Sequence, residues 1–116
     1  ADILNRDPQL KSLYLTTQQQ VLNRCCHVLT KLKQDKVLTI DTEDIAPLAE
    51  TIRMIICFWI GHKQTHSSNM LITKSSLYEG LLRVLMLSKA YSTADSHSTF
   101  VRLEQHYREL ADAPTE

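Results

Sequence analysis

Two histidines four residues apart are the first candidates for chemistry in this sequence. If their segment is helical, His62 and His66 lie one turn apart, a spacing that lets two imidazoles share a metal ion. The residues between them are Lys63, Gln64 and Thr65, so the glutamate of an H-E-x-x-H zinc site is missing. We favour the alternative, a solvated helix end whose histidines suit the negative end of the helix dipole, and expect no metal site.

Three cysteines offer a second kind of chemistry. Cys25 and Cys26 are adjacent, and adjacent side chains of a helix point about 100° apart, which excludes a relaxed disulfide between them. We expect Cys25 to be a small core residue with Cys26 at its margin. A thiol sensor needs an exposed thiolate of low pKa, and only the nearby Arg24 and Lys31 would favour one. An odd cysteine count without a secretory signal predicts reduced thiols and a cytoplasmic protein.

No set of catalytic residues emerges from the rest of the chain. Every serine falls in a loop or on a polar helix face, so order alone supports no Ser–His–Asp group. The neighbouring carboxylates Glu43 and Asp44 are explained as acids in the first turn of a helix. Two glycines, Gly61 and Gly80, cannot build a phosphate-binding loop. We therefore expect no enzymatic activity and no cofactor.

The composition predicts one small helical domain. The chain has 116 residues, 43% of them hydrophobic, but only 2 glycines and 3 prolines, too few turn-formers for a β-sandwich or barrel. Basic and acidic residues balance at 13 each, without the excess of positive charge typical of nucleic-acid-binding domains. The longest apolar run, 54–60, is far shorter than the ~20 residues of a membrane span, so we expect no membrane association. Because the chain starts at Ala1 and runs straight into a helix start, we expect it to be part of a longer protein.

Apolar residues recur at helical spacing in four segments. Asp7 is placed to cap the first helix, with Pro8 at its first position, and Thr73 is placed to cap the third. The apolar link 37–40 is the longest candidate for a strand. The predicted helices span 8–34, 42 or 43 to 65, 73 to about 91, and 98–111. The sequence thus predicts an all-α, four-helix bundle-like domain over residues 1–116.

The second predicted helix is apolar nearly all round, which predicts a buried, central position. Trp59 stands on it with Phe58, Met54 and Cys57 as neighbours, and we expect it to be largely buried. Such a helix must be wrapped on all sides by other helices, a ligand or a second subunit.

A ligand cavity is one way to complete that wrapping. The residues we expect to line it come from the first three helices: Tyr14, Gln18, Val21, Cys25, Ile55, Phe58, Trp59, His62 and Leu81. Because Arg24 and Arg53 stand alone, no arginine cluster is available for an anion, and the lining favours an apolar or aromatic molecule over a phosphate or sugar. The alternative is that these side chains pack together and leave no cavity.

The third predicted helix carries two apolar stripes, of which one can face the core and the other a second subunit. On a monomer, the second stripe would be an apolar patch exposed to water, which is energetically unfavourable. We therefore expect a two-fold symmetric homodimer. The residues predicted for its seam are Tyr78, Leu82, Met86, Val101 and Gln105.

Three stretches of residues 5–91 together resemble the regulatory domain of TetR-family (tetracycline-repressor-like) bacterial transcriptional regulators. They are Arg6-Asp7-Pro8-Gln9-Leu10 with Tyr14, Phe58-Trp59, and Glu79-Gly80-Leu81-Leu82 through Leu87 with Tyr91. The resemblance implies an all-helical homodimeric domain, joined through its last two helices, that binds a small and often apolar effector. It also implies a separate N-terminal helix-turn-helix domain, outside this chain, that binds operator DNA.

We therefore interpret the chain as the ligand-sensing and dimerisation domain of a transcriptional regulator, expected to be a repressor released from DNA by an effector. One alternative is a stand-alone helical protein-interaction module without a small-molecule site. A metal or thiol sensor built on His62, His66 or the cysteines is the third and least favoured.

Overall fold

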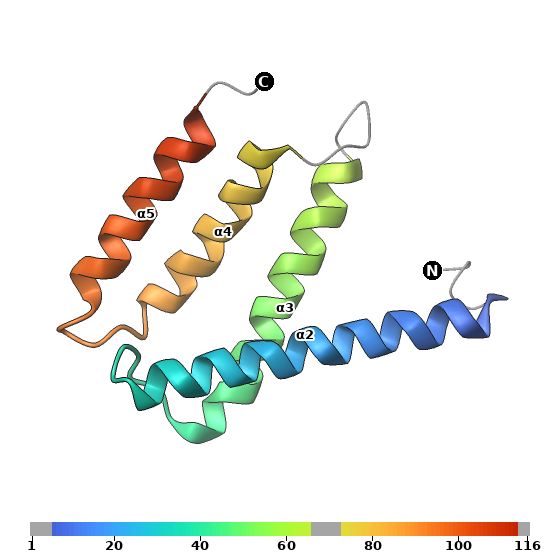
Figure 1. Ribbon diagram of the computed structural model, residues 1–116, viewed down its shortest axis with the longest axis horizontal. Coiled ribbons are helices and arrows are strands. Elements are labelled where there is room, and N and C mark those ends of the chain that lie inside the picture. The colour runs from blue at the N-terminus through green and yellow to red at the C-terminus, as the bar shows by residue number, and fades with distance from the viewer. Residues whose placement is uncertain (1–5, 66–72, 114–116) are drawn as a thin grey trace.

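The computed structural model of the chain describes residues 6–65 and 73–113, and these residues fold into helices. The helices are α2 (Pro8–Gln34), α3 (Thr42–Thr65), α4 (Lys74–Lys89) and α5 (His97–Asp112) (Figure 1). The all-α class is confirmed, and the predicted helix ends agree with these bounds to within about two residues. The largest difference is at the end of α4, which stops at Lys89 rather than near Tyr91.

Side-chain caps explain where two of these helices begin. The Asp7 carboxylate accepts hydrogen bonds from the backbone N–H groups of Gln9 and Leu10, at 3.0 and 3.1 Å. The Thr73 hydroxyl oxygen accepts one from the Ser76 N–H at 3.0 Å. Each cap satisfies N–H groups that have no partner within the helix. Both predicted caps are confirmed.

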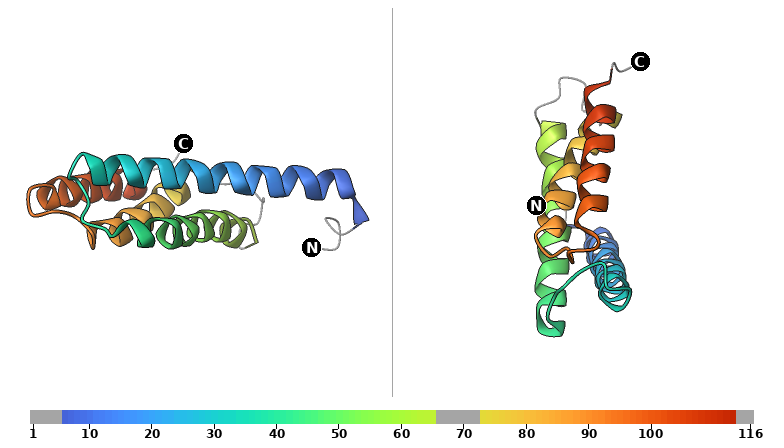
Figure 2. Two further views of the ribbon diagram at one scale, coloured as in Figure 1. Left: turned by 90° about the horizontal axis from the view of Figure 1, so that it is seen from below. Right: turned by 90° about the vertical axis from the view of Figure 1, so that its left-hand side faces the viewer.

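The helices form an open, flat arrangement. Helices α3, α4 and α5 lie side by side and run alternately up, down and up, whereas α2 crosses α3 and extends past it (Figures 1 and 2). The principal extents are 49 × 39 × 15 Å, and the radius of gyration is 16.4 Å. A compact domain of this length has a radius of gyration of about 13 Å. Much of the apolar surface is therefore left without cover from the same chain.

The core lies where the helices converge near the loops that follow α2 and α4. Leu29 of α2 packs there with residues of α3 and with Phe100 of α5. The buried members of the cluster are Leu29, Leu38, Ile40, Ile45, Leu48, Ala49, Ile52 and Phe100. One end of the molecule is thus held by a shared core, and the far ends of α2 and α3 are not.

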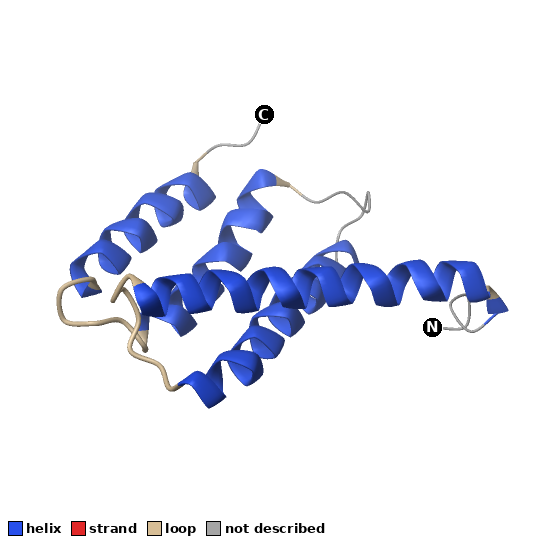
Figure 3. Cartoon of the chain, turned by 60° about the horizontal axis from the view of Figure 1, so that its bottom comes forward, coloured by secondary structure: helices blue, strands red, loops and turns tan. Residues whose placement is uncertain are grey.

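The two loops at this end are hydrogen-bonded to each other (Figure 3). The predicted link 37–40 forms an isolated antiparallel bridge, in which Leu38 pairs with Ser92. Its backbone bonds run from the Thr39 N–H to the Tyr91 carbonyl at 2.6 Å, and from the Thr93 N–H to the Val37 carbonyl at 3.1 Å. The Ser96 hydroxyl donates to the same Val37 carbonyl. We call these two segments, 36–39 and 91–96, the loop clamp.

Specific side-chain contacts join α4 to α5. Lys89 forms an ion pair with the buried Glu104, with 2.7 Å between Nζ and Oε1. At the other end of the pair of helices, the rings of Tyr78 and Tyr107 lie 5.8 Å apart between centroids. Helices α4 and α5 therefore form one hairpin, whereas α2 and α3 form a second unit that the loop clamp ties to it.

Parts of the first two long helices are exposed. The N-terminal half of α2 extends beyond the other helices, and Leu13 in this half is 63% exposed (Figure 1). Helix α3 was predicted to be buried on all sides. This prediction is wrong: its first half buries only one face, formed by Ile45, Leu48, Ala49 and Ile52, and Met54 and Phe58 of its second half are 65% and 73% exposed. Among the described helices, α2 and α4 alone contact α3. None of the described helices is both long and apolar enough to cross a membrane.

Candidate functional site

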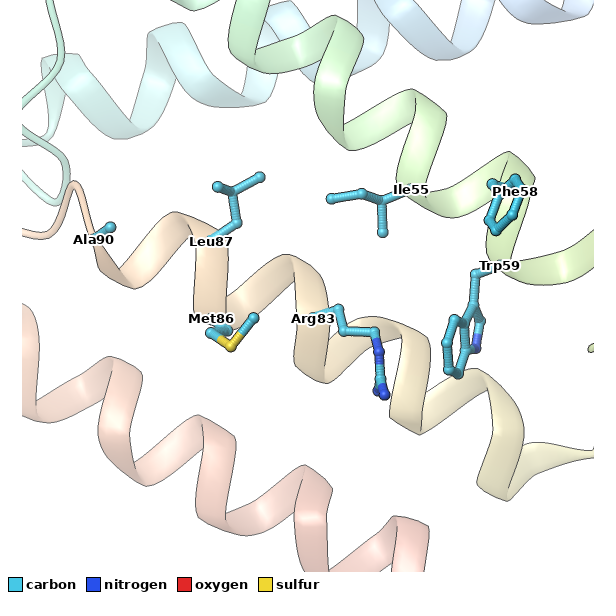
Figure 4. Close-up of a pocket in the computed structure, with 7 residues that line it drawn as sticks. All are labelled: Ile55, Phe58, Trp59, Arg83, Met86, Leu87 and Ala90. Atoms are coloured by element: carbon cyan, nitrogen blue, oxygen red, sulfur yellow. The ribbon is translucent and has the colours of Figure 1, made fainter. Parts of the chain in front are cut away.

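An open apolar groove of about 520 Å³ lies between α3 and α4. Its volume is within the range of roughly 300–1,000 Å³ that small-molecule sites occupy. Figure 4 shows side chains from the two helices facing one another across the groove. The lining residues are Ile55, Phe58 and Trp59 of α3, Arg83, Met86 and Leu87 of α4, and Ala90, the C-cap residue of α4.

Helical spacing explains why the lining residues of each helix lie on one face of that helix. On α3 the lining positions are separated by three and four residues, which places them on one face. On α4 the positions 83, 86, 87 and 90 follow the same rule over two turns. The groove lies between two points at which α3 and α4 are held together, the shared core with its loop clamp and the contact of Trp59 with α4.

Trp59 joins the two helices at the end of the groove away from the loop clamp. Its indole Nε1–H donates a hydrogen bond to the Ser76 carbonyl of α4 at 2.8 Å. The ring lies against the backbone of Gly80, where a Cβ would come within 2.5 Å of Trp59 Cδ1. Most of the Trp59 surface is covered, but the residue lines the groove and does not belong to the core cluster, so the prediction is wrong only in placing it in the core. The reason is that α4 covers the indole, and within this chain the open groove lies beside it.

Arg83 supplies the charge in an otherwise apolar lining. Its guanidinium carbon lies 4.1 Å from the centroid of a Trp59 ring, the geometry of a cation–π contact (Figure 4). Its Nη1 donates to the Glu79 carbonyl at 3.0 Å, one turn earlier on α4. Sequence reasoning considered Arg24 and Arg53 for an anion but missed Arg83, although its spacing of four residues from Leu87 places both on the groove face of α4.

The family comparison covers most of the chain. The family model of the bacterial transcriptional repressor TetR matches residues 1–100. The chain belongs to the TetR family. No curated protein matches the chain closely enough to add to this assignment. The matched range includes all three stretches on which the sequence resemblance depends, and it assigns this TetR-family domain to transcription regulation.

The groove of the TetR-family domain brings together some of the residues predicted to bind a ligand. Ile55, Phe58 and Trp59 line it. Leu81 is half-buried on α4 and is not among the lining residues, and the side chain of His62 lies outside the described residues. Met86, predicted for the dimer seam, lines the groove with Leu87 and Ala90 of the same helix, which were not predicted to do so.

The predicted ligand residues of α2 lie away from this groove. Tyr14 is exposed on the projecting half of the helix. Gln18 is half-buried and its amide nitrogen donates to Cys57 Sγ of α3 at 3.4 Å. Val21 and Cys25 are half-buried, and Cys25 packs against the core. Of the four residues, Gln18 and Cys25 therefore serve packing between the helices, whereas Tyr14 is exposed.

The residues predicted for the dimer seam differ in their surroundings. Tyr78 stacks on Tyr107 within the same chain, and Leu82 is half-buried. Met86 and Val101 are exposed. Gln105 is exposed and donates to the Glu109 carboxylate at 3.1 Å.

The structure gives the thiols and histidines no metal-binding role within the residues it describes. Among the described side chains, no group of three histidines, cysteines or carboxylates could hold a metal ion; the side chains of His62 and His66 are outside this set. Burial raises the pKa of the Cys25 thiol, and the neighbouring Cys26 raises it further. A raised pKa keeps Cys25 protonated at neutral pH, the opposite of what a reactive thiolate needs.

Proposed function

We propose that this TetR-family domain senses a small apolar effector in the groove between α3 and α4. The observation that carries the proposal is the groove itself, with a volume typical of ligand sites, apolar walls and a tryptophan at one end. The proposal keeps Ile55, Phe58 and Trp59 of the residues predicted from the sequence and adds the facing residues of α4.

The position of the groove gives the effector a way to act on the whole domain. One wall belongs to the α2–α3 unit and the other to the α4–α5 hairpin. A molecule that binds between them favours conformations in which the two units are further apart. We propose that α2 passes this change to a DNA-binding domain outside these 116 residues, so that the repressor is released from its operator.

We also propose that the domain forms a homodimer through α4 and α5. Support comes from the exposed apolar side chains that this hairpin presents, Leu77, Met86, Val101 and Leu103. An apolar surface of this kind is costly on a monomer in water and is typical of a protein interface. Of the predicted seam residues, Leu82, Met86, Val101 and Gln105 belong to this proposal, and Tyr78 contributes through its stack on Tyr107.

The dimer is tested by sedimentation equilibrium at tens of micromolar. We expect a dimer for the unmodified chain and a folded monomer for Val101→Glu, because a buried charge in the seam has no partner. Thr16→Glu, on the exposed surface of α2, is the matched control and should stay dimeric. A monomeric unmodified chain would contradict the proposal.

The ligand site is tested with 1-naphthol as a neutral aromatic probe. The chain has a single tryptophan, so fluorescence reports directly on the groove. We expect saturable quenching of Trp59 and a raised melting temperature, as mass action requires. Phe58→Glu, at a groove residue outside the proposed dimer seam, should abolish both effects, and Leu15→Glu, an exposed apolar residue of α2, should leave them unchanged. If 1-naphthol neither quenches nor stabilises, the result favours the alternative, a helical interaction module without a small-molecule site.

A further inference from the structure

We infer that the groove between α3 and α4 takes an amphipathic monocarboxylate, whose carboxylate binds Arg83 and whose apolar body lies along the groove. The inference rests on the proposed ligand-sensing function and names the chemical class of the effector. The sequence alone pointed to an apolar or aromatic molecule and to no anion-binding group in the lining, because the placement of Arg83 in the lining depends on the tertiary structure.

The charge of the groove is concentrated at one position. Of the seven described residues that line the groove, Arg83 is charged and the other six are apolar or aromatic. Among the described residues, no ion pair joins Arg83 to a carboxylate; the two ion pairs found there are Lys31–Asp35 and Lys89–Glu104. Its described contacts are the Glu79 carbonyl and the face of Trp59. The described part of the groove thus presents one positive charge to a ligand.

Arginine is suited to a carboxylate in this setting. The planar guanidinium carries five N–H donors in a fixed fork that matches the two oxygens of a carboxylate. The hydrogen bond to Glu79 uses one of these donors, and the Trp59 contact holds the group in place. Arg83 is exposed and the groove is open, so the fork geometry and the adjoining apolar wall, rather than exclusion of water, favour this pair.

The walls define the rest of the ligand. From Arg83 to Ala90 the groove follows α4 for seven residues, about 10 Å at ~1.5 Å per residue. Ile55 and Leu87 face one another along this length (Figure 4). Among the described lining residues, none besides Arg83 offers a charge to a second anionic group, so a phosphate with two charges would be poorly matched. An aliphatic chain or a fused aromatic ring with one carboxylate fits this pattern.

The test compares ligands that differ only in the head group. Trp59 fluorescence is titrated with decanoate, with decanol and with decyltrimethylammonium, each below its micelle concentration, and with 2-naphthoate as the aromatic carboxylate. We expect decanoate or 2-naphthoate to bind at least about tenfold more tightly than decanol, which is the effect of one charge-assisted hydrogen-bonded pair. The cation should bind more weakly than decanol. Tighter binding of decanoate would indicate an aliphatic effector, and tighter binding of 2-naphthoate an aromatic one.

Variants of Arg83 show whether this residue is responsible. Arg83→Gln should reduce the preference for decanoate over decanol to less than about twofold, whereas Arg102→Gln, an exposed arginine of α5, should leave the preference intact. Arg83→Lys keeps the positive charge but lacks the forked guanidinium, so its preference for decanoate over decanol should lie between those of the unmodified chain and Arg83→Gln. If circular dichroism shows that Arg83→Gln is not folded, the preference for decanoate over decanol is measured with Arg83→Lys instead.

The outcomes separate the two proposals. If decanol binds as tightly as decanoate and both quench Trp59, the apolar effector site stands and the carboxylate inference fails. If decanoate is preferred but the preference survives Arg83→Gln, the inference also fails. If no probe binds, both proposals fail. If no probe binds and Phe58→Glu converts a dimer to a monomer, the groove is a contact with a second copy of the chain instead.

Discussion

The indole of Trp59 lies directly against the backbone of Gly80, so that a Cβ at position 80 would come within 2.5 Å of Cδ1 and 2.9 Å of Nε1. Contacts this close to a carbon do not occur, so a side chain at position 80 must displace the indole. The same indole donates to the Ser76 carbonyl at 2.8 Å, one turn earlier on α4. The glycine in Glu79-Gly80-Leu81-Leu82 is therefore explained by close approach of a tryptophan from another helix, rather than by a turn.

Gly80→Ala should loosen the joint between α3 and α4. We expect a loss of about 1–2 kcal/mol in the free energy of unfolding, since overpacking at Trp59 exceeds the gain in helix propensity. Trp59 emission should also shift to longer wavelength. Gly61→Ala is the matched control, because among the described residues nothing lies within 4 Å of a Cβ at that position. It should stabilise the helix by up to about 1 kcal/mol. Equal effects of both substitutions in urea denaturation would contradict the packing described.

Trp59→Phe isolates the hydrogen bond of the indole. Phenylalanine keeps an aromatic ring against Gly80 but cannot donate to the Ser76 carbonyl. We expect a loss of about 1 kcal/mol from the hydrogen bond, with a further contribution from the weaker cation–π contact to Arg83. Thermal denaturation followed by far-ultraviolet circular dichroism measures it. An unchanged melting temperature would mean that neither contact stabilises the fold.

The ion pair between Lys89 and Glu104 should respond differently to removal of each partner. The side chain of Lys89 is 31% exposed and that of Glu104 is 9% exposed. Lys89→Met leaves a buried carboxylate without its partner and should cost about 3 kcal/mol. Glu104→Gln leaves an amine that can reach water and should cost about 1 kcal/mol. Chemical denaturation gives both values, and the reverse order would show that Glu104 has access to solvent.

The three thiols should differ in reactivity and in their effect on alkaline stability. At pH 8, iodoacetamide should modify the exposed Cys57 first and Cys25 last, because burial raises the pKa of the Cys25 thiol. Mass spectrometry of digested samples measures the order.

The raised pKa of the Cys25 thiol also determines how the stability of the fold depends on pH. The pKa of its thiol is higher in the folded chain than in the unfolded chain, so the neutral form contributes stability below the ordinary thiol pKa, and this contribution is lost as the pH rises above it. Cys25→Ala should therefore reduce the fall in stability above about pH 9. An alkaline profile that the substitution leaves unchanged would contradict burial of this thiol.

The limits of the helices were determined by the sequence itself. Caps and hydrogen bonds between residues close in sequence fix where a helix begins and ends, so Asp7 and Thr73 could be identified without a structure. The resemblance to the TetR family also came from local stretches, and the family comparison confirms it. The bridge between Leu38 and Ser92 could be anticipated only as an apolar link, because its partner lies 54 residues further along the chain.

Which face of each helix is covered was decided by the tertiary structure. Helical periodicity shows that Ile55, Phe58 and Trp59 share a side, but it does not show which helix lies opposite. The sequence pointed to α2, whereas α4 lies opposite in the structure and brings Arg83 to the Trp59 ring at 4.1 Å. Burial depends on neighbours that are distant in sequence, and an amphipathic stripe looks the same whether a helix of this chain, a ligand or a second subunit covers it. For this reason the apolar character of α3 could be recognised from its residues, while the groove and the charge within it could not.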